Sequence, residues 1–221
     1  MLGGEQKARH GLFWLDLLWP KHCYHCQQPG SWLCHDGQQQ LTANWHWRSL
    51  PIDHKSSLTA IIYCADYHQP LLNKLLKLTK YQRLTIAGRI LAINLAEFIQ
   101  QTIAEQLWFK QSLITAVPLS RQRLNWRGFN QAQLLVETIA KVNNCPTASY
   151  WRRQHRPPQA HLNKNARLTN LDQAFSWLKY SAGQNFIIID DVVTTGTTLT
   201  EMANCLKQSG ANEIRGLALA H

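Results

Sequence analysis

The stretch FIIIDDVVTTGTTLTEMANCLKQSG, residues 186–210, constrains the fold more than any other part of the chain. It opens with four apolar, mostly β-branched residues, which predict a short strand buried on both faces, as in a parallel sheet. Apolar residues then recur at helical spacing: Leu199, Met202, Ala203 and Leu206. Thr198 with Glu201 fits a capping box, and Gly210 fits the position after a helix end. The segment therefore predicts a strand, a tight loop and a helix.

The predicted loop combines features of a phosphate site with two carboxylates. Gly196 permits a positive φ, and the amides around it meet the positive end of the helix dipole, so they can cradle a phosphate. Asp190 and Asp191 would repel the same phosphate, so we expect them to bind sugar hydroxyls or Mg²⁺ nearby. The simpler alternative is that the acids end the strand and the threonines form a turn. The order of strand, acid pair, loop and capped helix favours a phosphorylated ribose as ligand.

The segment IIIDDVVTTGTTL closely resembles the phosphoribosyl-diphosphate (PRPP) motif of type I phosphoribosyltransferases. The resemblance implies that Asp190 and Asp191 contact the ribose hydroxyls and that Mg²⁺ accompanies PRPP. It also implies that the loop holds the 5′-phosphate through Thr194, Thr195, Gly196, Thr197 and Thr198.

Composition bounds the rest of the chain. The 221 residues are 45% apolar, which is typical of a globular protein, and 23 basic against 13 acidic residues give a net charge of +10. Such a charge favours polyanionic partners. Residues 11–20 are apolar but lack the features of a secretion signal, and no segment is long enough to span a membrane. We expect a cytoplasmic protein whose six cysteines are thiols or metal ligands.

The amino-terminal region carries a candidate zinc site. Cys23, Cys26 and Cys34 have the spacing of a zinc knuckle, but position 37, where a fourth cysteine is expected, is Gly37. The fourth ligand stays open among His22, His25, His35 and His46. The alternative is a metal-free knuckle held by tryptophan packing, from Trp14, Trp19, Trp32, Trp45 and Trp47. We expect this Cys-rich, zinc-ribbon-like segment to occupy residues 1–50, and the main domain to occupy residues 51–221.

The middle of the chain predicts the architecture of that main domain. Strands are expected at residues 58–64 and 112–120, and helices at 68–81 and 84–108. This order is typical of a doubly wound α/β domain with a mostly parallel sheet. The loops after Val117 and Ile189 then open at the same sheet edge. Arg121, Arg123 and Arg127 would face the acid pair there and meet a pyrophosphate.

A long basic segment, RRQHRPPQAHLNKNARLTNLDQAF, covers residues 152–175. Pro157 and Pro158 exclude a helix at their position. Long basic loops of this kind often act as lids or binding surfaces.

Several blocks together resemble the ComF competence-protein family. They are VPLSRQRLNWRGFNQAQLL, the acid-pair loop, the ending GLALAH, and the spaced residues Gln159, Leu162, Arg167, Asn170, Ala174 and Phe175. A Cys-rich knuckle ahead of a phosphoribosyltransferase domain is also that family's layout. The resemblance implies a part in DNA uptake during natural transformation, alongside a helicase-like partner. Gly37 and the Pro157–Pro158 pair depart from the family pattern.

Two functions follow. The first is a phosphoribosyltransferase, in which Asp190, Asp191 and Arg127 serve catalysis and Arg121 and Arg123 bind the pyrophosphate end. The second is a non-catalytic factor that binds or processes single-stranded DNA on the same fold, with Trp126 and Trp151 as stacking faces. The sequence leaves open whether turnover occurs, which base accepts the sugar, and the oligomeric state.

Overall fold

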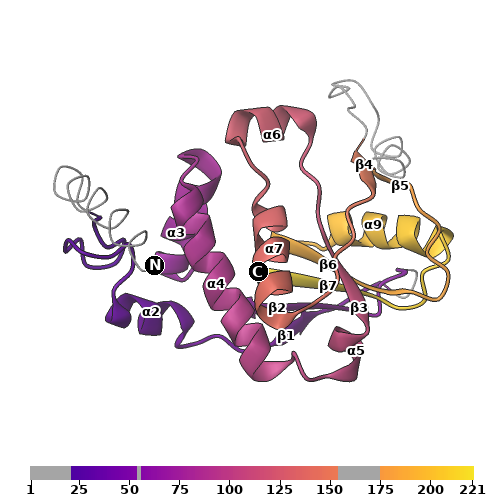
Figure 1. Ribbon diagram of the computed structural model, residues 1–221, viewed down its shortest axis with the longest axis horizontal. Coiled ribbons are helices and arrows are strands. Elements are labelled where there is room, and N and C mark those ends of the chain that lie inside the picture. Colours follow the sequence, from indigo (N-terminus) through magenta and orange to yellow (C-terminus); the bar gives the residue numbers. More distant parts are fainter. Residues whose placement is uncertain (1–20, 54–55, 154–174) are drawn as a thin grey trace, which may run out of the picture. The chain divides into compact units, whose positions relative to one another are not determined.

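A computed structural model describes residues 21–53, 56–153 and 175–221 of the chain (Figure 1). The chain divides into two compact units, Met1–Ala43 and Asn44–His221. Trp45 and Trp47 were expected to pack in the knuckle, but both pack on Phe98 within the larger unit, at 5.8 Å and 5.2 Å between ring centroids. The boundary at residue 50 stays a prediction about separately folding domains.

The described part of the smaller unit is a turn followed by a short helix, α2 (His35–Thr42). The turn is closed by main-chain hydrogen bonds, including Cys23 N–H to the Gln28 carbonyl at 2.9 Å. Tyr24 and Trp32 stack with centroids 5.9 Å apart. Leu41 is fully buried, so α2 has an apolar anchor despite its polar sequence.

The larger unit is built on a five-stranded sheet in the order β1-β2-β7-β6-β3. Its strands are β1 (Arg48–Leu50), β2 (Ala60–Ala65), β7 (Ile214–Ala220), β6 (Asn185–Val192) and β3 (Ser112–Ala116). All neighbours pair in parallel except β1, which is antiparallel to β2. Residues 186–189 are buried without interruption, as expected for a strand covered on both faces. The predicted α/β class with a mostly parallel sheet is confirmed.

Helices join and cover these strands: α3 (Pro70–Tyr81), α4 (Thr85–Thr102), α5 (Leu107–Lys110), α6 (Arg121–Arg127), α7 (Gln131–Asn143) and α9 (Thr197–Gln208). The helix α7 packs against α4, β3 and β6, and α9 packs against β7, β6 and β5 (Figure 1). The prediction of one helix over residues 84–108 is wrong. The chain leaves helical geometry at Ile103, where the Thr102 hydroxyl donates back to the Phe98 carbonyl and the Ile103 side chain enters the core.

The direction of the chain through the sheet reverses between β3 and β6. After α7 the chain passes outside β3, where Ile114 forms a parallel bridge with Thr147 and Ala148 N–H donates to the Ile114 carbonyl at 3.0 Å. From β6 the chain instead crosses through α9 to β7 on the other side. This is a doubly wound arrangement, and open α/β sheets bind ligands at the carboxyl ends of the strands where the direction reverses.

A second, two-stranded sheet lies between these crossovers in the chain, formed by β4 (Trp151–Arg153) and β5 (Phe175–Trp177) as an antiparallel pair. The residues between the two strands, 154–174, lie outside the described part of the structure. Within the described residues, no helix has the length and apolar character needed to cross a membrane.

Candidate functional site

The acid-pair loop follows β6 at the sheet edge where the chain direction reverses. Val193 N–H donates to the Ala220 carbonyl at 2.9 Å, which holds the start of the loop against β7. Gly196 has φ 76° and is the N-cap of α9. The predicted capping box at Thr198 is therefore wrong, because the left-handed turn at Gly196 starts the helix two residues earlier than a Thr198 cap would, and no side chain caps it.

The main-chain amides of this loop are open. The N–H groups of residues 194–198 donate to none of the residues that the structure describes. Thr195 and Thr197 are exposed, and their hydroxyl oxygens lie 2.8 Å apart. A Cβ on Gly196 would lie 2.6 Å from Cδ1 of Ile61, so the end of that side chain would have to shift, and any other residue at position 196 would have to adopt a left-handed backbone. Unpaired amides beside a helix start form an anion-binding concavity.

The acid pair is half-buried immediately before these amides. Asp191 N–H donates to Oδ1 of Asp190 at 2.8 Å. Burial raises the pKa of Asp190 to about 8, and the negative charge of Asp191 acts in the same direction. Two carboxylates crowded together in this way favour a proton, a cation or a hydroxyl donor between them.

Lys80, at the carboxyl end of α3, offsets part of the negative charge of the acid pair. Its Nζ lies 3.0 Å from Oδ2 of Asp191, and both side chains are largely buried, at 18% and 13% exposed. The approach is that of an ion pair without hydrogen-bond alignment, since the same Oδ2 atom has no well-directed hydrogen bond. Lys80 was not among the residues that the sequence predicted for this site.

Arg153 is a second cation near the site, and it was not among the residues predicted from the sequence. It donates to the Pro118 carbonyl at 2.7 Å, and its guanidinium lies 4.9 Å from the centroid of the Phe175 ring. Burial lowers its pKa and so does Arg123, whereas Glu201 and Asp190 act in the opposite sense. Arg153 therefore lies within electrostatic range of both the acid pair and α6.

The arginines predicted for the site lie on α6, which begins directly after the loop that follows β3. Ser120 caps this helix by accepting from Arg123 N–H at 3.3 Å. Arg121 and Arg123 are exposed, and Arg127 is half-buried and donates to Oε1 of Gln131 at 3.0 Å. Within the described residues none of the three pairs with an aspartate of the acid pair, so their roles stay predictions.

A pocket of about 810 Å³ opens beside the loop at the carboxyl ends of β2, β7 and β6. Its lining includes Thr194, Thr195, Lys80, Tyr63, Tyr67 and His221. The rings of Tyr63 and His221 lie 5.0 Å apart, and Nδ1 of His221 is 3.1 Å from the Val193 carbonyl. The pocket is thus lined both by the loop with the open amides and by aromatic side chains.

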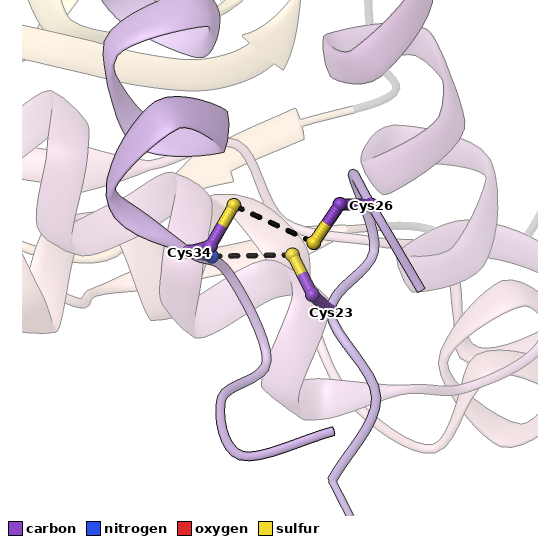
Figure 2. Close-up of side chains that lie close together, drawn as sticks. All are labelled: Cys23, Cys26 and Cys34. Carbon is purple, nitrogen blue, oxygen red and sulfur yellow. Dashed lines mark hydrogen bonds between the residues drawn. The ribbon is translucent and has the colours of Figure 1, made fainter. Parts of the chain in front are cut away.

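The three amino-terminal cysteines converge within the smaller unit. The sulfurs of Cys23, Cys26 and Cys34 all lie within 4.8 Å of one another, a grouping that can hold a metal ion (Figure 2). Burial alone would raise the pKa of Cys23, but main-chain hydrogen bonds from Cys26, Cys34 and His25 lower it to about 7. Among the thiols outside the cluster, Cys64 is buried, whereas Cys145 and Cys205 are half-buried.

The ends of the basic segment 152–175 lie in β4 and β5, and its residues 154–174 lie outside the described part of the structure. Those residues include Pro157, Pro158, Gln159, Leu162, Arg167, Asn170 and Ala174. Trp14 and Trp19 also lie outside the described residues. Phe175, the last residue of the spaced family pattern, is described and is buried.

Comparisons with known proteins agree with this geometry. The family model for the phosphoribosyl transferase domain matches residues 88–220, from α4 through β7. The DNA utilization protein YhgH of Escherichia coli (strain K12) is 31% identical over 159 residues, which cover 70% of this chain and 69% of that protein. Competence protein ComFC of Bacillus subtilis (strain 168) is 37% identical over 102 residues, covering 46% of this chain and 40% of ComFC.

Competence protein F of Haemophilus influenzae is 35% identical over 113 residues, covering 48% of this chain and 49% of that protein. The matched domain contains the acid pair, the open loop and α6, and the relatives share competence or DNA utilization in their names. The chain belongs to the phosphoribosyl transferase domain family and, within it, to the ComF competence proteins.

Proposed function

We propose that this protein binds PRPP, or a closely related phosphoribosyl ligand, at the loop between β6 and α9. One observation carries the proposal: shortly after two half-buried carboxylates, a run of main-chain amides at a helix start pairs with none of the residues that the structure describes. The amides and hydroxyls suit a phosphate, and the carboxylates suit a diol or a cation. A sugar phosphate presents both groups on one small molecule.

Each predicted residue then has a role. The 5′-phosphate lies on the amides of Thr194, Thr195, Gly196, Thr197 and Thr198. Asp190 and Asp191 accept hydrogen bonds from the ribose hydroxyls. Arg121, Arg123 and Arg127 serve the pyrophosphate end, and Arg153 adds a cation there because it contacts the Pro118 carbonyl at the neighbouring loop.

Mg²⁺ fits this donor set. Magnesium is usually bound through one or two carboxylates together with substrate phosphates. Asp190, whose pKa is raised by burial and by Asp191, presents a carboxyl that a cation would stabilise in its charged form. When bound with PRPP, Mg²⁺ would offset negative charge on the pyrophosphate.

The supported reaction is transfer of the phosphoribosyl group to a nitrogen nucleophile with release of pyrophosphate. Negative charge grows on the departing pyrophosphate, so cations fixed before the reaction lower the barrier. The pocket beside the loop is large enough for a flat acceptor and is lined by Tyr63, Tyr67 and His221. Relatives named for DNA utilization and for competence support the proposal that this chemistry serves DNA use.

Thermal unfolding tests the proposal directly. PRPP with Mg²⁺ at about 100 times its Kd should stabilise the protein by roughly 2.7 kcal/mol, which for a chain of this size raises Tm by about 5–10 °C. The double variant Asp190→Asn/Asp191→Asn should lose this shift. Glu105→Gln is the matched control, because it also removes a carboxylate, here one paired with Lys110 on the exposed surface.

The ligand needs controls of its own. Pyrophosphate with Mg²⁺ should produce a smaller shift than PRPP, because it lacks the ribose hydroxyls and the 5′-phosphate. A PRPP shift that survives in the double Asn variant, or its absence from the unaltered protein, would contradict the proposed site.

One observation favours a second function, binding of single-stranded DNA. Trp126 on α6 is 48% exposed, and its ring lies 5.9 Å from the ring of Tyr81, which is 61% exposed. Arg121 and Arg123 lie on the same short helix. Exposed aromatic rings among cations are the usual elements of a single-strand binding surface. Trp151 does not share this property, because it donates to Thr115 and packs on Trp177.

The DNA function predicts a clear mutational pattern. Trp126→Ala should weaken binding of an unstructured oligonucleotide by about 1–3 kcal/mol, since one stacked base is lost. Tyr180→Ala, which removes another strongly exposed ring, should leave the affinity unchanged. Fluorescence anisotropy over a range of salt concentrations measures both. Equal affinity in the unaltered protein and Trp126→Ala would remove this surface from consideration.

A further inference from the structure

The cysteine cluster has the dimensions of a zinc site with one position still to be assigned. The sulfurs of Cys26 and Cys34 lie 3.8 Å apart (Figure 2). A tetrahedral zinc ion with Zn–S bonds of about 2.3 Å places its sulfur ligands about 3.8 Å apart. The spacing of these two side chains already matches that edge.

The main chain around the cluster is arranged to support thiolates. Sγ of Cys23 accepts hydrogen bonds from the main-chain N–H groups of His25 at 3.4 Å and Cys34 at 3.2 Å. Sγ of Cys34 accepts one from Gly37 N–H at 3.3 Å, so it also caps α2. Hydrogen bonds of this kind orient metal ligands and hold them in place. The main chain of the knuckle therefore holds the sulfurs of Cys23 and Cys34 in position for a metal ion.

His25 lies close to one sulfur of the cluster. Its Nδ1 is 3.7 Å from Sγ of Cys34. For zinc bond lengths of about 2.3 Å to sulfur and about 2.05 Å to nitrogen, a tetrahedral sulfur–nitrogen edge is about 3.6 Å. His25 is thus at ligand distance from the sulfur of Cys34. It lies outside the group of atoms that are all within 4.8 Å of one another, so its imidazole must rotate toward Cys23 and Cys26 to complete the site.

Gly37 explains why this histidine can reach the cluster. A Cβ built on Gly37 would lie 2.8 Å from Cβ and 3.2 Å from Cγ of His25. The histidine side chain therefore occupies the space that any side chain at position 37 would need. The residue expected as the fourth ligand from cysteine spacing is absent, and an imidazole fills its place.

We propose that His25 is the fourth ligand of a structural zinc site formed with Cys23, Cys26 and Cys34, and that Gly37 makes room for it. The other histidines described in this unit have different positions. Nε2 of His35 lies 3.0 Å from Nε2 of Gln39 on the exposed side of α2, and His22 forms a bridge with Pro29. His46 belongs to the larger unit and lies beside the Asn44 carbonyl.

The test uses the full chain, with bound zinc measured by elemental analysis and by competition with a chelator. The unaltered protein should hold one equivalent of zinc. His25→Ala should weaken zinc binding by more than the roughly 10- to 100-fold that loss of an outer partner costs, because a direct ligand is removed. His35→Ala is the matched control and should bind zinc normally.

A compensating variant tests the role of Gly37. In His25→Gly/Gly37→Cys both the imidazole and the Cβ of residue 25, 2.8 Å from the new Cβ, are gone, and the remaining obstacle is the flexible end of Leu33 at 2.7 Å. We expect tight metal binding to return. The absorption spectrum of the cobalt-substituted protein should then change from that of three sulfurs and one nitrogen to that of four sulfurs.

One measurement does not depend on any variant folding. X-ray absorption at the zinc edge of the unaltered protein should show three sulfur ligands and one imidazole. A coordination shell without imidazole, a zinc affinity unchanged in His25→Ala, or an unaltered protein that binds no zinc would each overturn the proposal.

Discussion

Gly196→Ala is expected to abolish the PRPP-dependent rise in Tm and to lower the free energy of unfolding by about 3 kcal/mol. Two costs combine. Alanine at φ 76° must adopt a left-handed backbone, and its Cβ would lie 2.6 Å from Cδ1 of Ile61. Relief of that clash requires the Ile61 side chain to rotate or the loop to shift, and we expect the left-handed strain at position 196 to disturb the alignment of the amides on either side. Chemical denaturation and the PRPP melt measure the two effects separately.

Two further variants separate these costs. Gly183→Ala places a methyl group at φ 70° with no atom within 4 Å, so it should show the backbone cost alone, about 1–2 kcal/mol. Ile61→Val removes the Cδ1 atom that opposes the new Cβ. In that background Gly196→Ala should cost less, and the difference is the coupling energy of a double-mutant cycle. If Gly196→Ala lowers the free energy of unfolding no more than Gly183→Ala does, and the PRPP-dependent rise in Tm is intact, the proposed phosphate site at this loop is contradicted.

The strand, loop and helix of this site could be predicted because their signals are local. A β-branched run, a glycine between threonines and a 3.6-residue apolar period each act within a few residues, and β6 and α9 follow them closely. The parallel sheet also followed from the alternation of strands and helices. Only the helix start was misplaced, because a left-handed glycine can replace a side-chain cap.

The two additional cations could not be predicted, because their partners are distant in the sequence. Lys80 shares its helix with Lys74 and Lys77, which are exposed, and nothing in the local pattern distinguishes it from them. Its ion pair with Asp191 arises only when α3 is placed over the carboxyl end of β6. Arg153 likewise reaches the site only because its side chain, on β4, contacts the loop at Pro118. A cation in the last turn of a helix does not by itself predict an ion pair at a binding site.

The acid pair lowers the stability of the unliganded protein, and the fold alone does not require it. Asp190 and Asp191 are held side by side in a half-buried position, with Lys80 paired to Asp191. Neighbouring carboxylates of this kind destabilise an unliganded protein, and such arrangements are concentrated at binding and catalytic sites. Removal of one charge should therefore have a different effect from removal of the other.

Asp190→Asn is expected to stabilise the unliganded protein at pH 9 by several kcal/mol and to have little effect near pH 4. Burial and the Asp191 charge raise the pKa of Asp190 from 3.8 to about 8 in the folded state. Between these values the folded protein keeps a proton that the unfolded chain releases, so rising pH lowers stability throughout that window. Above pH 8 the carboxylate is charged in both states and the full penalty remains. Asparagine carries no such penalty.

Asp191→Asn should have the opposite sign at neutral pH. It leaves Lys80, whose side chain is 18% exposed, without its partner, and an uncompensated buried charge is destabilising. Both variants should lose PRPP binding, so the pair separates the effect on stability from the effect on the ligand. Urea unfolding from pH 4 to pH 9, without Mg²⁺, gives the comparison. If Asp190→Asn lowers stability at pH 9 as much as Asp191→Asn does, the raised pKa of Asp190 is excluded, and the acid pair is a structural feature rather than a site held ready for a ligand.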